Sequence, residues 1–362
     1  GYDFPQLIRG NIGYDRSLVA GLIGSVELLF SKTTKDIDYE NLNLRAAGDR
    51  PDGRPFYARA NPSFSDVVFL TNTGEGNSST VATKIERPFR NGWYASGSYL
   101  YGRSRTVNDG GSSQARSNWI NNYFGSEGVN DPPVAISNFD PGHRITASMA
   151  YELPIGPTRA TLSLYYNGQT GRPYAYRFSN DVNVDQGTTN DLFYIPRDAS
   201  DVIIANGSFD QLMAFLEDAN CADLTPGTIV ERNSCRGPWV NTMDFHAALN
   251  VPFGRYSGEV TFDVLNLINL FDSESGLVEF ATFNGIAPAS AAVSPATGQW
   301  VYTLNNIVLT PDTQSSSAPR GEDTKPLISP VRDADALLRG TIAVWCAVGL
   351  GSLALASLLN EK

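Results

Sequence analysis

Residues 144–152 read RITASMAYE, and this stretch decides the fold class. Four apolar residues stand at every second position: Ile145, Ala147, Met149 and Tyr151. Successive side chains of a β-strand point to opposite faces of the sheet. The alternation therefore predicts a strand with one apolar and one polar face.

The same alternation recurs along the chain, most clearly in residues 22–30, 81–86, 159–166 and 244–251. We expect about 10–12 such strands, each close to the ~9–11 residues with which a tilted strand crosses a membrane. The sequence therefore predicts an all-β, antiparallel fold of the transmembrane β-barrel type.

The connections between these strands differ in length at the two ends. Short turns are predicted at 88–92, 154–157 and 252–255. Long polar excursions are predicted at 46–63, 106–142, 179–241 and 284–298. Tight turns on one rim and long loops on the other are typical of outer-membrane barrels, whereas a soluble sandwich usually turns every ~8–12 residues.

Charged residues lie in the middle of the predicted strands, on their polar faces. They are Glu27, Lys84, Glu86, Glu152, Arg159, Asp244 and Asp263. A dry core does not accept them, because a buried charge needs a partner, whereas a wet or plugged lumen does. The alternative is the solvated face of an open antiparallel sheet. The apolar faces, with Trp93, Tyr94, Tyr99 and Tyr101, would meet lipid and form aromatic girdles.

The charge balance limits the function. The 362 residues include 27 basic and 38 acidic ones, a formal net charge of −11. This excludes nucleic acid as a partner held by bulk charge. The two histidines, His143 and His246, accompany no nucleophile elbow, P-loop or His-Glu-x-x-His motif, so we expect no enzymatic activity.

The chain divides into a barrel portion, residues 1–314, and a tail, residues 315–362. The tail contains a linker and an apolar run at 342–359, which meets the lower limit of ~17–25 residues for a transmembrane helix. Two interpretations stay open: an anchor helix, or a tail that is not native coding sequence. The chain begins at Gly1 without a signal peptide, so we expect a processed or truncated protein.

Cys221 and Cys235 lie in the same long loop. An exported loop meets an oxidising compartment, so a disulfide is predicted, which would stabilise the loop by ~3 kcal/mol. The alternatives are two free thiols in a cytosolic chain and, less favoured, a zinc site.

Residues 181–185 supply oxygen side chains at alternate positions, Asp181, Asn183 and Asp185, as calcium loops of the EF-hand type begin. With Asp191 as a further ligand they predict a Ca²⁺ site; no other cofactor is required. The pattern lacks the EF-hand glycine and the final Glu. The alternative is a loop of Asx turns, in which these side chains bond their own backbone.

Five stretches carry a family resemblance: 136–146 (ISNFDPGHRIT), 166–174 (YNGQTGRPY), 190–198 (NDLFYIPRD), 232–239 (RNSCRGPW) and 263–271 (DVLNLINLF). In this order they resemble the C-terminal barrel region of TonB-dependent outer-membrane receptors of the Oar-like group. The resemblance covers about residues 1–310 and implies part of a barrel of about 22 strands in a Gram-negative outer membrane. It also implies a plug that engages the TonB complex; neither that plug nor the family's terminal aromatic strand is seen in this sequence.

The resemblance implies energy-coupled uptake of an extracellular solute, with outer-membrane lipid around the barrel. Aromatic residues of the long loops would stack on a sugar or peptide: Trp119, Tyr123, Phe124, Tyr174 and Tyr176. Two alternatives stay open. One is an outer-membrane adhesion or surface-organising protein without transport, and the other is a soluble β-sandwich binding module.

Overall fold

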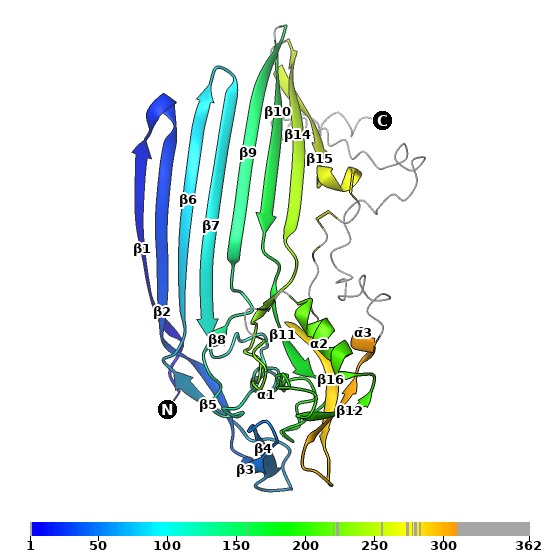
Figure 1. The fold of residues 1–362 in the computed structure, drawn as a ribbon. Coiled ribbons are helices and arrows are strands. Elements are labelled where there is room, and N and C mark those ends of the chain that lie inside the picture. Colours follow the sequence, from blue (N-terminus) through cyan, green and yellow to red (C-terminus); the bar gives the residue numbers. More distant parts are fainter. Residues whose placement is uncertain are drawn as a thin grey trace, which may run out of the picture.

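The computed structural model describes residues 2–309, except 157, 220, 222–223, 255, 273–274, 277, 279–280 and 282–283. Eight long strands form an antiparallel meander, in which each long strand pairs with the long strand that follows it in the sequence (Figure 1). They are β1 (Gln6–Ser17), β2 (Ile23–Asn41), β6 (Asn77–Arg90), β7 (Trp93–Thr106), β9 (Gly142–Ile155), β10 (Thr158–Gln169), β14 (Val240–Phe253) and β15 (Tyr256–Val264). Two short strands, β5 (Val68–Thr73) and β8 (Ala135–Ile136), pair with β2 and β7 and bring the sheet to ten. The predicted antiparallel, partial-barrel architecture is confirmed.

The strand register separates apolar and polar side chains into two faces. Directly paired residues share a face, and the pairs Met149–Leu164, Leu164–Phe245 and Phe245–Val264 cross four strands. We call this side the apolar face. The opposite side, which carries Lys84, is the polar face. A register slip of one residue would exchange the two faces, so the alternation fixes the pairing.

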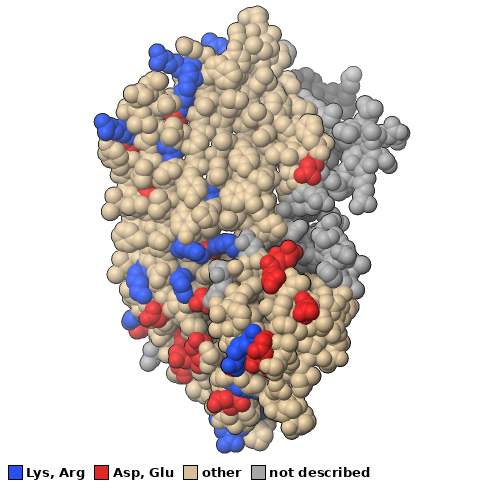
Figure 2. Space-filling view, in the orientation of Figure 1, with Lys and Arg blue, Asp and Glu red and all other residues tan. Residues whose placement is uncertain are grey.

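The described part of the chain leaves side chains of the apolar face exposed: Ile12 is 65% exposed, Ile85 55% and Met149 44%. Figure 2 shows that the surface over the long strands is almost free of charged side chains, which gather instead around the loops and near the short turns. Within the described residues, no strand pairs with the outer edge of β1 or of β15.

The turns at one end of the sheet are tight. At Asn91-Gly92 both residues have positive φ, 55° and 78°, as a two-residue type I′ hairpin requires. A 3₁₀ turn, η1 (Val19–Gly21), joins β1 to β2. The three predicted turns are correctly placed, but the strands run further into them, so Pro88 already lies within β6.

The connections at the other end fold together into a second unit, the loop domain, made of residues 42–76, 107–141, 170–239 and 284–309 without the strands β5 and β8, which belong to the long sheet. Its central sheet has the order β12-β17-β16-β11-β13, with β11 (Pro173–Phe178), β12 (Val202–Asn206), β13 (Cys235–Arg236), β16 (Gly285–Val293) and β17 (Trp300–Leu304). Around it lie β3 (Leu44–Asp49), β4 (Pro55–Arg59), α1 (Ala115–Ile120), α2 (Phe209–Glu217) and α3 (Asn306–Leu309). The short η2 (Leu267–Leu270) follows β15.

The predicted excursions are not plain polar loops. Residues 46–63 contain β4, residues 179–241 contain β12 and α2, and residues 284–298 contain β16 and the turn that leads into β17. Small residues of this segment are buried against large aromatic ones: Ala289 is 0% exposed and lies in the same core as Trp300 and Tyr302. This strand was not predicted because its alanine and serine residues have a low preference for strands.

Among the described helices, none has both the length and the apolar character needed to cross a membrane. The predicted tail, residues 315–362 with its apolar run at 342–359, lies outside the described residues.

Candidate functional site

The polar face of the long sheet carries a ladder of hydroxyl groups. The oxygen atoms of Ser31 and Ser78 are 2.7 Å apart, those of Ser96 and Ser148 2.7 Å, and those of Ser98 and Thr146 2.6 Å. Each pair bridges two neighbouring strands. These groups still have unused hydrogen-bonding capacity, so the face suits contact with water or with another polar segment of protein.

All seven charges predicted for the polar face lie there, as the register of the strands shows. Two ion pairs form there: Arg159 Nη1 of β10 lies 3.3 Å from Glu152 Oε2 of β9, and Lys84 contacts Glu86 two residues further along β6. The pairs are exposed and contribute little to stability. The face is therefore a charged, wet surface, as the lumen of a barrel requires.

His246 pairs with an acid on the neighbouring strand. Its Nδ1 lies 2.6 Å from Asp263 Oδ1 on the next strand. Asp244, its neighbour in sequence on the same face, accepts a 2.8 Å hydrogen bond from the backbone N–H of Asn266. The histidine thus belongs to the charged face, and Asp244 holds the chain where β15 ends.

Aromatic groups mark the ends of the apolar face. Near the short turns, the rings of Trp93 and Tyr151 pack with centroids 4.4 Å apart. Near the loop domain, Tyr99 O–H lies 2.7 Å from His143 Nδ1, and the Tyr101 ring packs on the same imidazole at 4.6 Å. Two aromatic bands on an apolar face are the expected boundary of a bilayer.

The five aromatic residues predicted to bind a solute have another role. Trp119 and Phe124, each 1% exposed, lie in a small core with Tyr39 and Val129. Tyr123 (8%) and Tyr176 (2%) lie in the larger core, and Tyr174 is half-buried against that core. The predicted stacking surface is corrected: four of the rings are closed off from solvent, because these loops are long enough to bury their own apolar residues.

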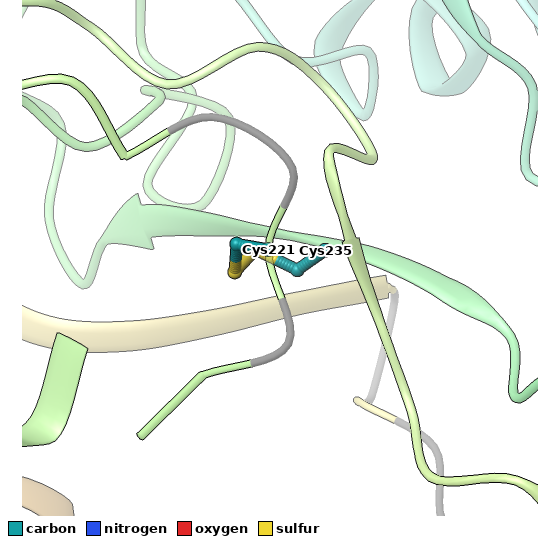
Figure 3. Close-up of a disulfide and its surroundings, with 2 residues drawn as sticks. All are labelled: Cys221 and Cys235. Atoms are coloured by element: carbon teal, nitrogen blue, oxygen red, sulfur yellow. A yellow bond between two sulfur atoms is a disulfide. The ribbon is translucent and has the colours of Figure 1, made fainter. Parts of the chain in front are cut away.

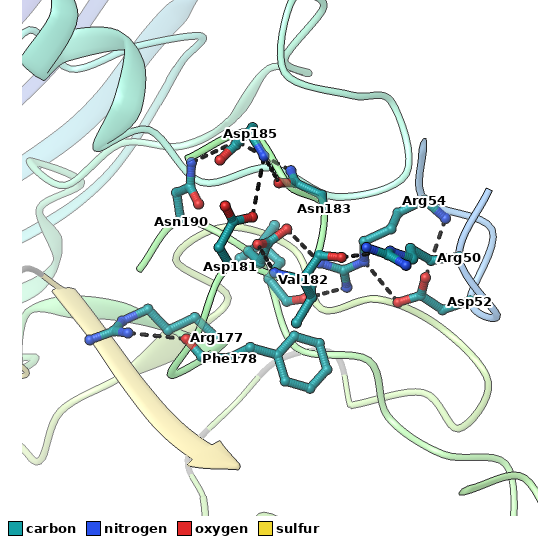
Figure 4. Close-up of polar contacts among 12 residues, drawn as sticks. Arg50, Asp52, Arg54, Arg177, Phe178, Asp181, Val182, Asn183, Asp185 and Asn190 are labelled. Carbon is teal, nitrogen blue, oxygen red and sulfur yellow. Dashed lines mark hydrogen bonds and ion pairs between the residues drawn. The ribbon is translucent and has the colours of Figure 1, made fainter. Parts of the chain in front are cut away.

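The residues predicted to bind Ca²⁺ do come together, in a buried loop (Figure 4). Their oxygen atoms, however, accept hydrogen bonds from the loop itself. Asp181 accepts from the backbone N–H of Gln186 at 2.8 Å, and Asp185 accepts from that of Gly187 at 2.6 Å. Asn183 Oδ1 accepts from the N–H of Asp185 at 3.0 Å. The Asx-turn interpretation describes this geometry.

The carboxylates of Asp185 and Asp191 also accept hydrogen bonds from nitrogen donors. Asn190 Nδ2 donates to Asp185 at 2.9 Å, and the N–H of Val182 donates to Asp191 at 2.9 Å. Throughout the described part of the chain, no three His, Cys, Asp or Glu side chains are grouped to hold a metal ion. The geometry therefore does not support the predicted Ca²⁺ site.

Burial changes the acidity of this cluster. Desolvation, with a further contribution from the nearby Asp191 carboxylate, raises the pKa of Asp185 to about 7. Desolvation also raises the pKa of Asp191 to about 6, against the opposing effect of the Arg54 guanidinium. Both carboxyl groups thus gain protons more readily than exposed aspartates do.

Arg54 is the structural residue that sequence reasoning missed. It is 1% exposed, and its guanidinium lies 2.9 Å from Asp52 and 3.1 Å from Asp191, while Nη2 donates to Leu192 O at 2.5 Å (Figure 4). Nearby, Arg50 Nε donates to Val182 O at 2.7 Å. These arginines tie the 42–76 connection to the 170–239 connection. The sequence shows the Asp-Gly-Arg turn at 52–54, but it does not show that Arg54 pairs with Asp191, which lies 137 residues away.

The predicted disulfide is confirmed: Cys221 and Cys235 are bonded, with 14 positions of sequence separation (Figure 3). Cys235 is completely buried and belongs to β13, which pairs with β11. The bond therefore fastens the segment after α2 to the central sheet of the loop domain.

A cavity of about 120 Å³ opens between the loops, with Tyr123, Leu192, Ile229 and Arg232 among its lining residues. Sites for drug-sized ligands usually measure ~300–1,000 Å³. This cavity is too small for a solute of that size, so the outer surface of the loop domain is the larger area available for recognition.

Comparison with known proteins agrees with this architecture. The sequence matches the outer membrane beta barrel domain family over residues 2–278, and the chain belongs to that family. It is therefore an outer-membrane protein. Neither a curated protein nor a solved structure gives a significant match.

Proposed function

We propose that this chain forms part of the barrel wall and the extracellular loops of a TonB-dependent receptor of the Oar-like group, which takes up a solute across the outer membrane of a Gram-negative cell. The observation that carries the proposal is the asymmetry of the two rims. Tight turns close one rim, whereas the other bears a folded domain with its own core. Outer-membrane barrels have their short turns in the periplasm and their long loops outside.

The polar face supports transport. Its charged groups and hydroxyl ladder suit a lumen that is filled by water or by a plug. In this proposal a plug domain, engaged by the TonB complex, packs against that face and moves to admit the solute. The protein acts by binding and carries out no bond-making step.

The solute, a sugar or peptide, would meet the outer surface of the loop domain. Of the five rings first considered, Tyr174 alone keeps a half-buried ring; its centroid lies 5.9 Å from that of Tyr176. Such a ring, held by an edge-to-face contact with a second ring, provides a rigid stacking surface.

Uptake assays in cells test this function. Labelled peptide and oligosaccharide pools are supplied to cells with the intact gene, to cells lacking it, and to cells in which TonB is disrupted. We expect uptake of one pool to fall equally in the second and third strains. Uptake that persists without TonB would contradict the proposal.

The second candidate is an adhesion or surface-organising protein. The buried loop aromatics favour it, because the loop domain is a folded unit that presents a closed surface to the outside. In that case cell attachment would depend on the gene and not on TonB.

A further inference from the structure

The apolar face is not evenly filled: it contains a groove of about 620 Å³ that runs from Arg16 and Leu18, at the short turn between β1 and β2, across the sheet to Ile145 of β9. Most of the side chains of the apolar face that line it are apolar or aromatic and are partly exposed. Tyr14 is 61% exposed, Ile85 55% and Ile145 41%. The groove is thus open to whatever surrounds the sheet.

The groove exists because Gly97 leaves an open position in the middle of a cross-strand row, whereas the side chain of Leu18 packs over Gly24, the other glycine of the row. Gly24 pairs with Ile85, Ile85 with Gly97, and Gly97 with Ala147. A Cβ atom added at Gly97 would have no atom within 4 Å. Glycine weakens a strand interior, so an empty position of this kind indicates that something else lies close to the backbone.

The short-turn end of the groove is cationic. Arg16 lines the groove and pairs with Gly24 on the apolar face. Arg87 and Arg90 belong to the same end, paired with Ala95 and Trp93. Arg87 is oriented by hydrogen bonds from its guanidinium to the carbonyl groups of Trp93 and Arg90, at 2.9 and 3.1 Å.

Among the residues that the structure describes, no acid shares this corner of the face. The neighbouring acids Asp15 and Glu86 alternate onto the polar face, paired with Ser25 and Ile23. An apolar trough that ends in unshared positive charge is complementary to a lipid, whose chain is apolar and whose phosphate is anionic.

We propose that the groove binds one acyl chain of a glycerophospholipid of the inner leaflet, with its phosphate against Arg16 and Arg90. The leaflet follows from the short turns, which face the periplasm in outer-membrane barrels. The site is independent of the proposed transport function, because it holds equally for a receptor and for an adhesion protein.

Photolabelling tests the site directly. The full chain is placed in bilayers of phosphatidylethanolamine and phosphatidylglycerol that contain phosphatidylglycerol with a diazirine in its acyl chain, and the labelled residues are mapped by mass spectrometry. We expect labelling to concentrate on residues 24–26, 83–85, 97–99 and 145–147.

Two leucine variants provide a matched pair. Gly97→Leu fills the groove and should reduce its labelling severalfold. Gly13→Leu adds the same side chain at another glycine with nothing within 4 Å, but on the polar face opposite Glu27, and should leave the labelling unchanged. Equal labelling in both variants, or even labelling across the whole apolar face, would overturn the proposal.

Variants of the arginines test the site independently, in case the Gly97→Leu protein does not insert into the bilayer. An arginine near an anionic surface contributes roughly 1 kcal/mol, so Arg16→Gln and Arg90→Gln should each lower labelling by the phosphatidylglycerol probe about fivefold. Unchanged labelling in both overturns the phosphate contact. If Val26→Cys instead forms cross-links between copies, which Gly97→Leu abolishes, the occupant is a second copy of this chain and the lipid proposal is wrong.

Discussion

The long sheet and the loop domain treat apolar side chains in opposite ways. The two cores consist almost entirely of loop-domain residues, among them Phe193 and Trp300, which are 0% and 1% exposed. The long strands instead expose Val26 (45%) and Met149 (44%) on their apolar face. We therefore expect one chain to use two media to remove apolar surface from water: the bilayer for the sheet and its own interior for the loops. Variants that change only the apolar face of the sheet, or only the core of the loop domain, therefore test the two regions separately.

The largest effect is expected from truncating the core of the loop domain. Phe193 packs against Phe178 and Tyr302, with ring centroids 4.9 and 5.4 Å away. Phe193→Ala should lower the free energy of unfolding of this domain by about 3–5 kcal/mol. Phe139→Ala removes a loop ring that is 75% exposed and should change it by no more than about 0.5 kcal/mol. Near-UV circular dichroism during urea unfolding measures both, and equal losses would contradict the assignment of this core.

A charge placed on either face of one strand tests the bilayer side of the comparison. Met149→Arg puts a charge on the apolar face and should cost about 2–4 kcal/mol near the bilayer midplane. Ser148→Arg puts the same charge on the polar face and should have a small effect. Urea unfolding from lipid vesicles, followed by gel migration, measures the difference. Similar losses for both variants would mean that the apolar face does not meet lipid.

The disulfide should matter to the loop domain alone. Replacing Cys221 and Cys235 by alanine should destabilise that domain by about 3 kcal/mol, the chain-entropy value for a closed loop of this size, while leaving unfolding of the sheet unchanged. A reducing agent should reproduce the loss in the wild type and do nothing further to the double variant. Loss of sheet protection in hydrogen exchange would show that the two regions are coupled.

The buried acids predict a pH dependence confined to the loop domain. The pKa of Asp185 is raised to about 7 from the ordinary 3.8, so the folded state favours the protonated form. Its contribution to stability is complete below the unfolded pKa near 4 and is lost as pH rises to about 7, at roughly 1.4 kcal/mol for each pH unit. The loop domain should therefore melt at a higher temperature at pH 5 than at pH 8.

Asp185→Asn is the control for this titration, because asparagine keeps one oxygen acceptor for the N–H of Gly187 and does not titrate. The variant should flatten the dependence of the melting temperature on pH between about 4 and 7, with Asp191 as the remaining source. A melting temperature that rises with pH in the wild type would reverse the sign and refute this account.

The sequence predicted the sheet well and the loop domain poorly, for a physical reason. Alternation is a local pattern, so the face on which Ile145 or Met149 lies can be predicted without knowing which strand pairs with it. The disulfide was also readable, because Cys221 and Cys235 lie close in one loop. The charges of the polar face followed from the same alternation.

The loop domain depends on contacts between distant segments. Arg54 meets Asp191 across 137 positions, and β11 pairs in parallel with β16, more than a hundred residues away. Periodicity gives no sign of such pairs. From the sequence alone, loop aromatics such as Trp119 are therefore predicted to be exposed binding groups, whereas the structure buries them in a core.

The smallest effect is expected at the start of α2, where local sequence does act within the loop domain. Ser208 caps the helix: its Oγ accepts from the N–H of Gln211 at 3.2 Å, and the Gln211 side chain accepts from the N–H of Ser208 at 2.9 Å. Ser208→Ala should cost about 1 kcal/mol and speed amide exchange in the first turn, whereas Ser208→Asp keeps an acceptor and should preserve protection. Because Leu212 and Leu216 anchor the same helix in the larger core, the loss should stay local. Global unfolding of the loop domain in Ser208→Ala would instead mean that the cap, and not the core, holds this helix in place.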